Sequence, residues 1–352
     1  MRPIYNKYPG LIDSLPLVQL AELPTPVRPL EKFSSVIGQN VFIKQDQNSG
    51  AEYGGNKVRK LEFLLADAVA QDYNEVVTYG AAGSNHALAT SIYAKQLGLK
   101  CYVILSHQPY TSKVAKTLRY HLQLGSNIIP AADYPAMLRV SAEVRARCQD
   151  NGKKLYEIPF GGSSAIGTIG FVNAALELAT QISNNAIPHP ERIYIACGTS
   201  GSATGLSIGL RLAKLNTQVI ATQVTPSSIS GKAAHSRLFE ETNQLLHSLD
   251  NSIPLLNDPL DNITHREDQY GPGYAESTIA AEQAIKLIHD LESTRLETTY
   301  TGKALATLID DAKTETCAHT AIFWNTYNAR PYPNTDKQLD TSLPAELQKY
   351  LG

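Results

Sequence analysis

The stretch Ile193-Tyr-Ile-Ala-Cys-Gly-Thr-Ser-Gly-Ser-Ala-Thr-Gly205 combines a strand-like run, a turn of small residues and the start of a helical pattern. Its first residues are β-branched and aromatic, as is typical of buried strands. Glycine and hydroxyl residues follow, and a helical pattern then continues to Leu215. The stretch therefore predicts a strand that leads through a tight turn into a helix.

The same unit recurs along the chain. Further runs of strand composition occupy 41–44, 75–79, 101–105 and 219–222. Helical patterns occupy 58–69, 85–97 and 235–249, and we expect a short last helix near 344–350. Several of the strand-like runs are apolar throughout, as in strands that are covered on both faces. This alternation predicts an α/β fold whose open, twisted, mainly parallel sheets carry helices on both faces.

Composition excludes several classes of protein. The chain has 352 residues, a formal charge of −2 and 43% hydrophobic residues, which fits one large or two modest globular domains. So small a charge offers no broad surface for nucleic acid or a membrane, and no apolar run has the length of a membrane span. The four cysteines and nine histidines show neither a zinc spacing nor a disulfide framework. We therefore expect a cytoplasmic enzyme without a metal.

A glycine turn places a lysine at the start of a predicted helix. In Glu52-Tyr-Gly-Gly-Asn-Lys57, the two glycines permit a tight turn just before that helix. The positive end of the helix dipole disfavours an ammonium group there, and a neutral amine is the form that Schiff-base chemistry needs. Lys60 lies one turn further on and could meet an anion. The plainer interpretation, a solvated lysine pair, is the one that composition alone favours.

Two other turns join a strand to a helix. The first turn ends in Ser84, Asn85 and His86. Its backbone N–H groups can bind an anion. The plainer interpretation is that Ser84 or Asn85 caps the helix. The second holds glycine and hydroxyl residues that suit a phosphate, although it is not a Walker loop; its residues are Gly198, Thr199, Ser200, Gly201 and Ser202. Each turn alone is a weak signal.

Tyrosines supply a further candidate feature. The chain has 18 tyrosines and 7 phenylalanines, and most of these tyrosines are expected to be structural. Tyr274 follows a Gly-Pro-Gly loop, and Tyr300 begins Tyr-Thr-Gly-Lys303. Both are candidates for phenols that face a ligand.

Taken in order, these motifs resemble the pyridoxal-phosphate enzymes of the tryptophan-synthase-β fold type. More narrowly, the chain resembles the 1-aminocyclopropane-1-carboxylate deaminase and D-cysteine desulfhydrase family over residues 23–326. The likeness is strongest in 54–62, 83–86, 158–178 and 300–303. It implies two open α/β domains with the cofactor in the cleft between them. The larger domain would comprise 1–59 and 172–352, and the smaller, inserted domain would comprise 60–171.

The resemblance also implies roles for individual residues, and it reverses the plain interpretation of Lys57. Lys57 matches the lysine that forms a Schiff base with pyridoxal 5'-phosphate, and Asn85 matches the asparagine that binds the cofactor's phenolic oxygen. Lys60 and the turn 198–202 match the phosphate site. Ser84 matches the active-site serine. The substrate carboxylate would dock at 84–86, and Tyr274 and Tyr300 match the two active-site tyrosines, with Tyr274 also near the substrate.

Two positions favour the desulfhydrase side of the family. Thr301 stands where the deaminase has a glutamate beside the ring nitrogen, and a hydroxyl there makes a weaker electron sink. Thr326 stands where the desulfhydrase has a threonine, and the resemblance implies that it contacts the cofactor. Both favour α,β-elimination from a small amino acid, with D-cysteine giving pyruvate, ammonia and sulfide.

The segment Trp324–Asn328 lacks the histidine and glycines of the desulfhydrase pattern, so alternatives stay open. They are a 1-aminocyclopropane-1-carboxylate deaminase, a β-replacement synthase, and a non-catalytic protein that has kept the fold. The resemblance further implies a homodimer.

Overall fold

The computed structural model describes residues 1–314 and 320–351, and its chain divides into two compact units. Unit 1 comprises Met1–Leu15, Ala21–Lys60 and Ser163–Ala329, and unit 2 comprises Pro16–Leu20, Leu61–Gly162 and Arg330–Gly352. We expected the last stretch of the chain in the larger domain, but it packs with unit 2. The second boundary also lies earlier than expected, after Gly162 instead of residue 171.

Among the described residues, unit 1 contains a six-stranded sheet in the order β1-β2-β10-β7-β8-β9. The strands are β1 (Val27–Pro29), β2 (Asn40–Lys44), β7 (Arg192–Cys197), β8 (Gln218–Gln223), β9 (Ile263–Arg266) and β10 (Thr320–Trp324). Strand β1 is antiparallel to β2, and the remaining neighbours in this sheet are parallel. The predicted, mainly parallel sheet is confirmed.

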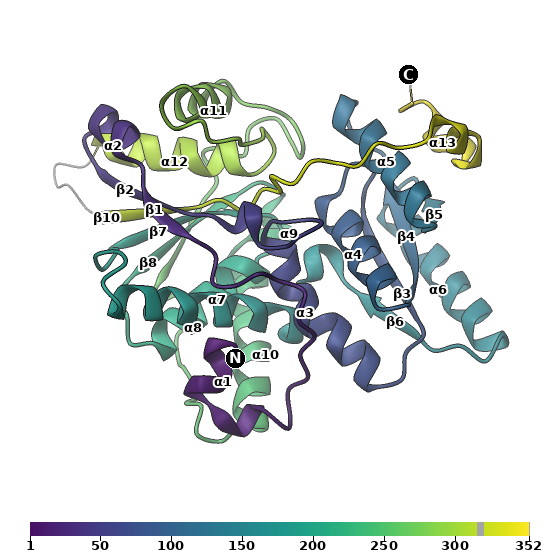
Figure 1. Cartoon of the computed structure of the whole chain (residues 1–352), viewed down its shortest axis with the longest axis horizontal. Coiled ribbons are helices and arrows are strands. Elements are labelled where there is room, and N and C mark those ends of the chain that lie inside the picture. The colour runs from purple at the N-terminus through teal and green to yellow at the C-terminus, as the bar shows by residue number, and fades with distance from the viewer. Residues whose placement is uncertain (315–319, 352) are drawn as a thin grey trace. The chain divides into compact units, whose positions relative to one another are not determined.

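Helices cover both faces of this sheet (Figure 1). One face packs against α2 (Glu31–Ile37), α11 (Ile279–Glu292) and α12 (Thr301–Thr314), and the other against α7 (Ala165–Ser183) and α8 (Gly201–Leu212). Helix α10 (Lys232–Leu249) packs against α7 and α8. Side chains of successive strand residues point to opposite faces of the sheet. In β7, Tyr194 lies in the core on the α12 side, whereas Ile193 and Ile195 lie in the core on the α7 side.

Helix α7 is the one described helix whose length and apolar composition would suffice to cross a membrane. However, 67% of its apolar window is buried inside the protein. Phe171, Ala174, Ala175 and Leu178 pack into the core below the sheet. These contacts identify α7 as a core helix of unit 1.

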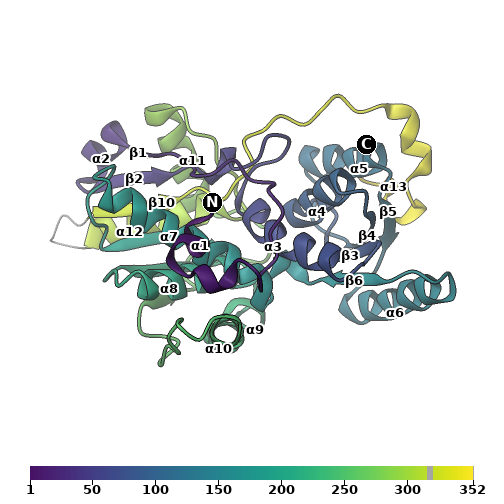
Figure 2. The same ribbon diagram turned by 60° about the horizontal axis from the view of Figure 1, so that its bottom comes forward.

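Unit 2 contains a parallel sheet in the order β5-β4-β3-β6. Its strands are β3 (Glu75–Ala81), β4 (Lys100–Ser106), β5 (Asn127–Pro130) and β6 (Leu155–Ile158). Helix α6 (Tyr134–Asp150) lies on one face, and α4 (Asn85–Gln96) and α5 (Ser112–Leu124) lie on the other (Figure 2). The α6 face is apolar, because Val77, Tyr79, Tyr102 and Ile104 pack there against α6.

The remaining helices are shorter or link the units. Helix α3 (Asn56–Ala70) runs from unit 1 into unit 2, and the others are α1 (Pro3–Lys7), α9 (Ser227–Ser230) and α13 (Ala345–Gln348). The predicted strands and helices are all present, with ends that differ by a few residues. Cys101, Cys148 and Cys197 are buried free thiols, whereas Cys317 lies outside the described residues.

Candidate active site

The turn that precedes α3 can be formed only with glycine. The Gly55 N–H donates to the carbonyl oxygen of Asp46 at 2.7 Å. A Cβ on Gly54 would clash with the carbonyl of Gln47, and Gly55 has a φ of +90°. Because both positions exclude side chains, the chain turns sharply and Lys57 becomes the second residue of α3.

Two lysines share the first turn of α3. Burial lowers the pKa of Lys57 to about 8, so a useful fraction of its amine is neutral at pH 7. The pKa of Lys60 lies well below its ordinary value, because the side chain is buried and because the Lys57 charge is close. Lys60 Nζ donates to Ser163 Oγ at 3.0 Å, and Ser163 Oγ lies 2.7 Å from Thr199 Oγ1. Lys60 therefore faces hydroxyl groups of the 198–202 turn.

A buried network of four charges supports the start of α3. The Arg59 guanidinium donates to Asp46 Oδ1 at 2.7 Å and to Glu177 Oε2 at 3.0 Å, and Lys44 Nζ donates to Glu177 Oε1 at 2.5 Å. Burial alone would raise the pKa of Glu177, but Arg59 and Lys44 lower it to about 2. Since Arg59 lies two residues after Lys57, this network fixes the helix turn that carries the lysine.

The turn 198–202 ends at the N-terminus of α8. An added Cβ on Gly201 would lie 2.5 Å from Ser163 Oγ and 2.6 Å from Lys60 Nζ, so the missing side chain leaves room beside these donors. Ser202 Oγ accepts a hydrogen bond from Asn56 Nδ2 at 2.9 Å, which ties this turn to the start of α3. A helix N-terminus, hydroxyl groups and a lysine around a glycine are a donor set that fits a phosphate group.

Tyr274 and Tyr300 form a pair. Their hydroxyl oxygens lie 2.7 Å apart, and their rings meet edge to face at a centroid distance of 6.2 Å. Tyr300 also lies against the phosphate turn, since a Cβ on Gly198 would be 3.3 Å from its ring. Burial raises the pKa of both phenols, and the nearby Glu297 carboxylate raises them further. Both tyrosines are therefore neutral at pH 7.

Thr301 is the first residue of α12, directly after Tyr300. Its side chain is buried, and its hydroxyl oxygen accepts a hydrogen bond from the Glu297 N–H at 3.0 Å. The Glu297 carboxylate in turn accepts from the N–H groups of Tyr300 and Thr301 at 2.9 and 2.8 Å. Glu297 thus caps α12 and forms hydrogen bonds with the backbone of Tyr300 and Thr301.

Thr326 lies at the turn before Lys57. Its carbonyl oxygen accepts a hydrogen bond from the Asn56 N–H at 3.3 Å.

In unit 2, the second predicted turn opens α4. Ser84 is its N-cap, and Ser84 Oγ accepts from the Ala87 N–H at 3.2 Å, as in the plainer interpretation of this residue. Asn85 Oδ1 accepts from Lys113 Nζ at 2.8 Å. This contact brings a cation of α5 to the helix start, a feature that the sequence did not indicate.

The His86 imidazole is buried in unit 2, where Nε2 lies 3.0 Å from Thr78 Oγ1 on strand β3. This contact directs the ring toward the sheet. A role for His86 in substrate binding stays a prediction.

Comparison with known proteins places the chain in a family. The sequence model described as "Pyridoxal-phosphate dependent enzyme" matches residues 18–320, which is most of the chain. This chain belongs to that family. The enzyme therefore uses pyridoxal 5'-phosphate, and the predicted fold type and cofactor are confirmed.

Its relatives are named for both of the activities considered above. The enzyme is 31% identical over 327 residues to a protein of Pyrococcus abyssi described as "Putative 1-aminocyclopropane-1-carboxylate deaminase", and the match covers 92% of this chain and 94% of that protein. It is 33% identical over 306 residues to a D-cysteine desulfhydrase of Salmonella choleraesuis, covering 85% and 89%.

Solved structures agree with this grouping. A structure described as an ACC deaminase homologue superposes with a TM-score of 0.80 at 28% identity and covers 97% of this chain and all of that one. The processed form of threonine deaminase isoform 2 from Solanum lycopersicum covers 92% of this chain and 87% of that one, with a TM-score of 0.59. Because that protein is only 15% identical, it supports the fold alone.

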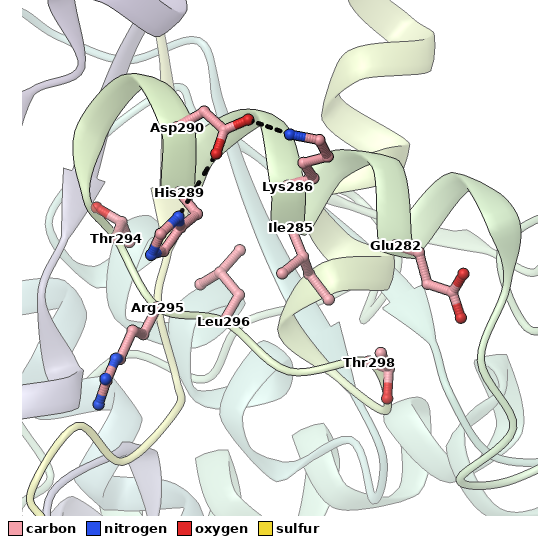
Figure 3. A pocket seen from close by; sticks show the side chains of 9 residues that line it. All are labelled: Glu282, Ile285, Lys286, His289, Asp290, Thr294, Arg295, Leu296 and Thr298. Atoms are coloured by element: carbon pink, nitrogen blue, oxygen red, sulfur yellow. Dashed lines mark hydrogen bonds and ion pairs between the residues drawn. The ribbon is translucent and has the colours of Figure 1, made fainter.

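A separate surface groove lies on α11 of the enzyme (Figure 3). Its volume is about 290 Å³, and the Lys286–Asp290 ion pair and Arg295 lie on its rim. It contains no residue that the sequence analysis selected. Its wall carries both signs of charge, so it indicates no particular ligand and we give it no role.

Proposed function

We propose that the enzyme catalyses α,β-elimination from a small amino acid with a leaving group on Cβ, as a D-cysteine desulfhydrase does. The observation that carries this proposal is the Lys57 amine, whose pKa of about 8 is combined with a phosphate-type donor set one helical turn away. The relatives named desulfhydrase and deaminase support it. The products from D-cysteine would be pyruvate, ammonia and sulfide.

The residues of unit 1 fit the cofactor. Lys60, Ser163, Thr199 and the α8 N-terminus at Gly201 would hold its phosphate, and Lys57 would hold its aldehyde carbon. When bound, the cofactor supplies an electron-withdrawing ring that stabilises negative charge on the substrate Cα. Thr301 would lie beside the ring nitrogen.

Once the substrate amine had replaced it on the cofactor, the freed Lys57 amine would be the base that removes the Cα proton. Its burial disfavours the ammonium form, and the Arg59 network fixes the turn from which the side chain extends. A positioned base of suitable pKa typically contributes about 10²–10⁴-fold to the rate. The electron pair of the Cα–H bond forms the Cα–Cβ double bond, and the Cβ–S bond breaks with its pair on sulfur.

The tyrosine pair would donate a hydrogen bond to the leaving group. In the hydrogen bond between Tyr274 and Tyr300, one phenol donates its hydrogen, so the other phenol keeps a hydrogen for a further acceptor. A departing thiolate is such an acceptor. The released enamine is then hydrolysed in water to the 2-oxo acid and ammonia.

The turn 83–86 of unit 2 would bind the substrate carboxylate. The dipole of α4 favours an anion there, and Lys113, held on Asn85, adds a positive charge. Ser84 Oγ lies at the same helix start.

Among the alternative activities, one observation argues against the deaminase. Opening a cyclopropane without a leaving group demands a strong electron sink, and Thr301 supplies a hydroxyl where a carboxylate would be needed. A homodimer and a cytoplasmic location stay predictions, and light scattering would test the first.

An assay for 2-oxo acids tests the proposal. We expect the purified enzyme to form pyruvate from D-cysteine or β-chloroalanine, and to form no 2-oxobutanoate from 1-aminocyclopropane-1-carboxylate. D- and L-forms are compared, and added thiols reveal β-replacement. A cofactor-loaded enzyme that releases no 2-oxo acid from any of these amino acids would contradict the proposal.

A further inference from the structure

The C-terminal segment of the enzyme is hydrogen-bonded to the loop that follows β4. Tyr350 is buried, and its hydroxyl accepts from the Gln108 N–H at 2.8 Å and donates to the Gln108 carbonyl at 2.8 Å. One phenol therefore satisfies both backbone groups of a single residue. These two bonds join positions that lie 242 residues apart in the sequence.

Gln108 in turn binds the glycine turn at the start of α4. Its Oε1 accepts from the Gly83 N–H at 2.8 Å. The carboxamide lies directly on this glycine, because an added Cβ would be 3.1 Å from both of its polar atoms. Gln108 thus closes the turn on one side and leaves little room for a side chain at position 83.

The rest of this turn is equally constrained. The Ser84 N–H donates to the Ala81 carbonyl at 2.8 Å, and a Cβ on Gly80 would clash with the Ser84 side chain. Contacts from Gln108, Ala81 and Gly80 together determine where Ser84 begins the helix. A change at Gln108 would therefore alter the position of the groups that we expect to bind the substrate carboxylate.

Other contacts hold the C-terminal segment on α5, independently of Tyr350. Arg119 pairs with Asp340 at 2.8 Å, with both side chains partly buried. The Tyr332 hydroxyl lies 3.3 Å from Thr117 Oγ1, and the rings of Tyr332 and Tyr120 are 5.8 Å apart. The segment therefore stays in place when a single hydroxyl is removed, so the effect of that hydroxyl can be measured separately.

We propose that Tyr350 is a positioning residue: through Gln108, it orders the turn 80–84 and so sets the affinity of the enzyme for the substrate carboxylate. This rests on the proposed function of that turn. The contacts of the Tyr350 hydroxyl lie within unit 2, whereas Lys57 and the phosphate turn belong to unit 1. Its removal should therefore raise KM without changing kcat.

The test compares Tyr350→Phe with Tyr332→Phe in the full-length, cofactor-loaded enzyme. Both variants remove one hydroxyl from the same C-terminal segment, and both keep the ring. Amide hydrogen exchange is measured by mass spectrometry on peptides that cover 80–88. We expect faster exchange there in Tyr350→Phe and in Gln108→Ala, and exchange unchanged from the wild type in Tyr332→Phe.

Kinetics supply the second measurement. For Tyr350→Phe we expect KM for the amino acid to rise by about three- to tenfold, the range for one or two neutral hydrogen bonds, with kcat unchanged. Tyr332→Phe should match the wild type. Unchanged exchange at 80–88, or changed exchange with an unchanged KM, would overturn the proposal.

The two measurements separate this proposal from the proposed function. If the wild type releases no 2-oxo acid, the proposed function fails, and the link to substrate affinity fails with it. The exchange result then still shows whether Tyr350 orders the turn. If the wild type is active and Tyr350→Phe behaves like the wild type, only the role of Tyr350 is wrong.

Discussion

The hydroxyl groups of Tyr274 and Tyr300 share a single hydrogen bond of 2.7 Å, although the two residues belong to separate loops of unit 1. The bond fixes one phenolic hydrogen between the two oxygens and leaves the other phenol able to donate outward. The two tyrosines therefore act as a unit, and their substitutions should not have independent effects.

For the tyrosine pair, we expect Tyr274→Phe and Tyr300→Phe each to lower kcat by about tenfold or more, because the charged leaving group loses its hydrogen-bond donor. The double variant should be little worse than either single variant, since groups that act as a unit are not additive. Steady-state assays of 2-oxo acid formation give these values. Effects that multiply in the double variant would show that the tyrosines act separately.

Replacing Gly201 by alanine should weaken cofactor binding. The new methyl group would come within 2.6 Å of Lys60 Nζ and would fill the space beside the donors. We expect the dissociation constant of pyridoxal 5'-phosphate to rise by about tenfold or more, as measured by fluorescence titration of the apo-enzyme. Gly273→Ala is the control, because its nearest neighbour is at an ordinary 3.7 Å. Equal affinities in the two variants would contradict the assigned phosphate site.

The buried charge network should make the free energy of unfolding depend on pH in the acidic range. Glu177 has a folded-state pKa of about 2, below the usual 4.5, so its contribution is present above pH 4.5 and is lost as the pH falls toward 2. Removal of one partner of a buried pair costs about 3–5 kcal/mol. We therefore expect Glu177→Gln to lower the free energy of urea unfolding at pH 7 by about that amount.

The same variant should show a smaller loss of stability between pH 4.5 and 2 than the wild type. Glu241→Gln on the exposed side of α10 serves as the control and should leave both quantities unchanged. A Glu177→Gln variant as stable as the wild type at pH 7 would show that the network does not support α3.

Capture of the cofactor by the apo-enzyme should follow the ionisation of Lys57. The neutral amine is the nucleophile, so the rate should rise about tenfold per pH unit below pH 8 and level off above it. A rate that keeps rising toward pH 10 would indicate an ordinary, exposed lysine. Stopped-flow absorbance measures this rate.

The sequence predicted those features that depend on neighbouring residues. The turn before Lys57, the strands and a cap at Ser84 or Asn85 all follow from local composition, and the structure contains each of them, with Ser84 as the cap. Local patterns could not show that Lys57 differs from a surface lysine. That distinction came from the order of several motifs along the chain.

Features that depend on distant residues were missed. Glu177 lies 133 residues after Lys44 and 118 residues after Arg59, and nothing local shows that these charges meet. A charged residue inside an apolar strand or helix was the available signal. Likewise, a last helix near Tyr350 was expected, but its packing with unit 2 was not, because that depends on contacts of the C-terminal segment with Gln108 and with α5.

The most direct test of the account is to locate the cofactor on the chain. The cofactor-loaded enzyme is reduced with borohydride, digested and analysed by mass spectrometry, with Lys57→Ala and Lys232→Ala as variants. We predict one reduced pyridoxyl group on Lys57, which is lost in Lys57→Ala and kept in Lys232→Ala. Attachment to Lys60 or another lysine, or no attachment to the wild type, would contradict the central claim.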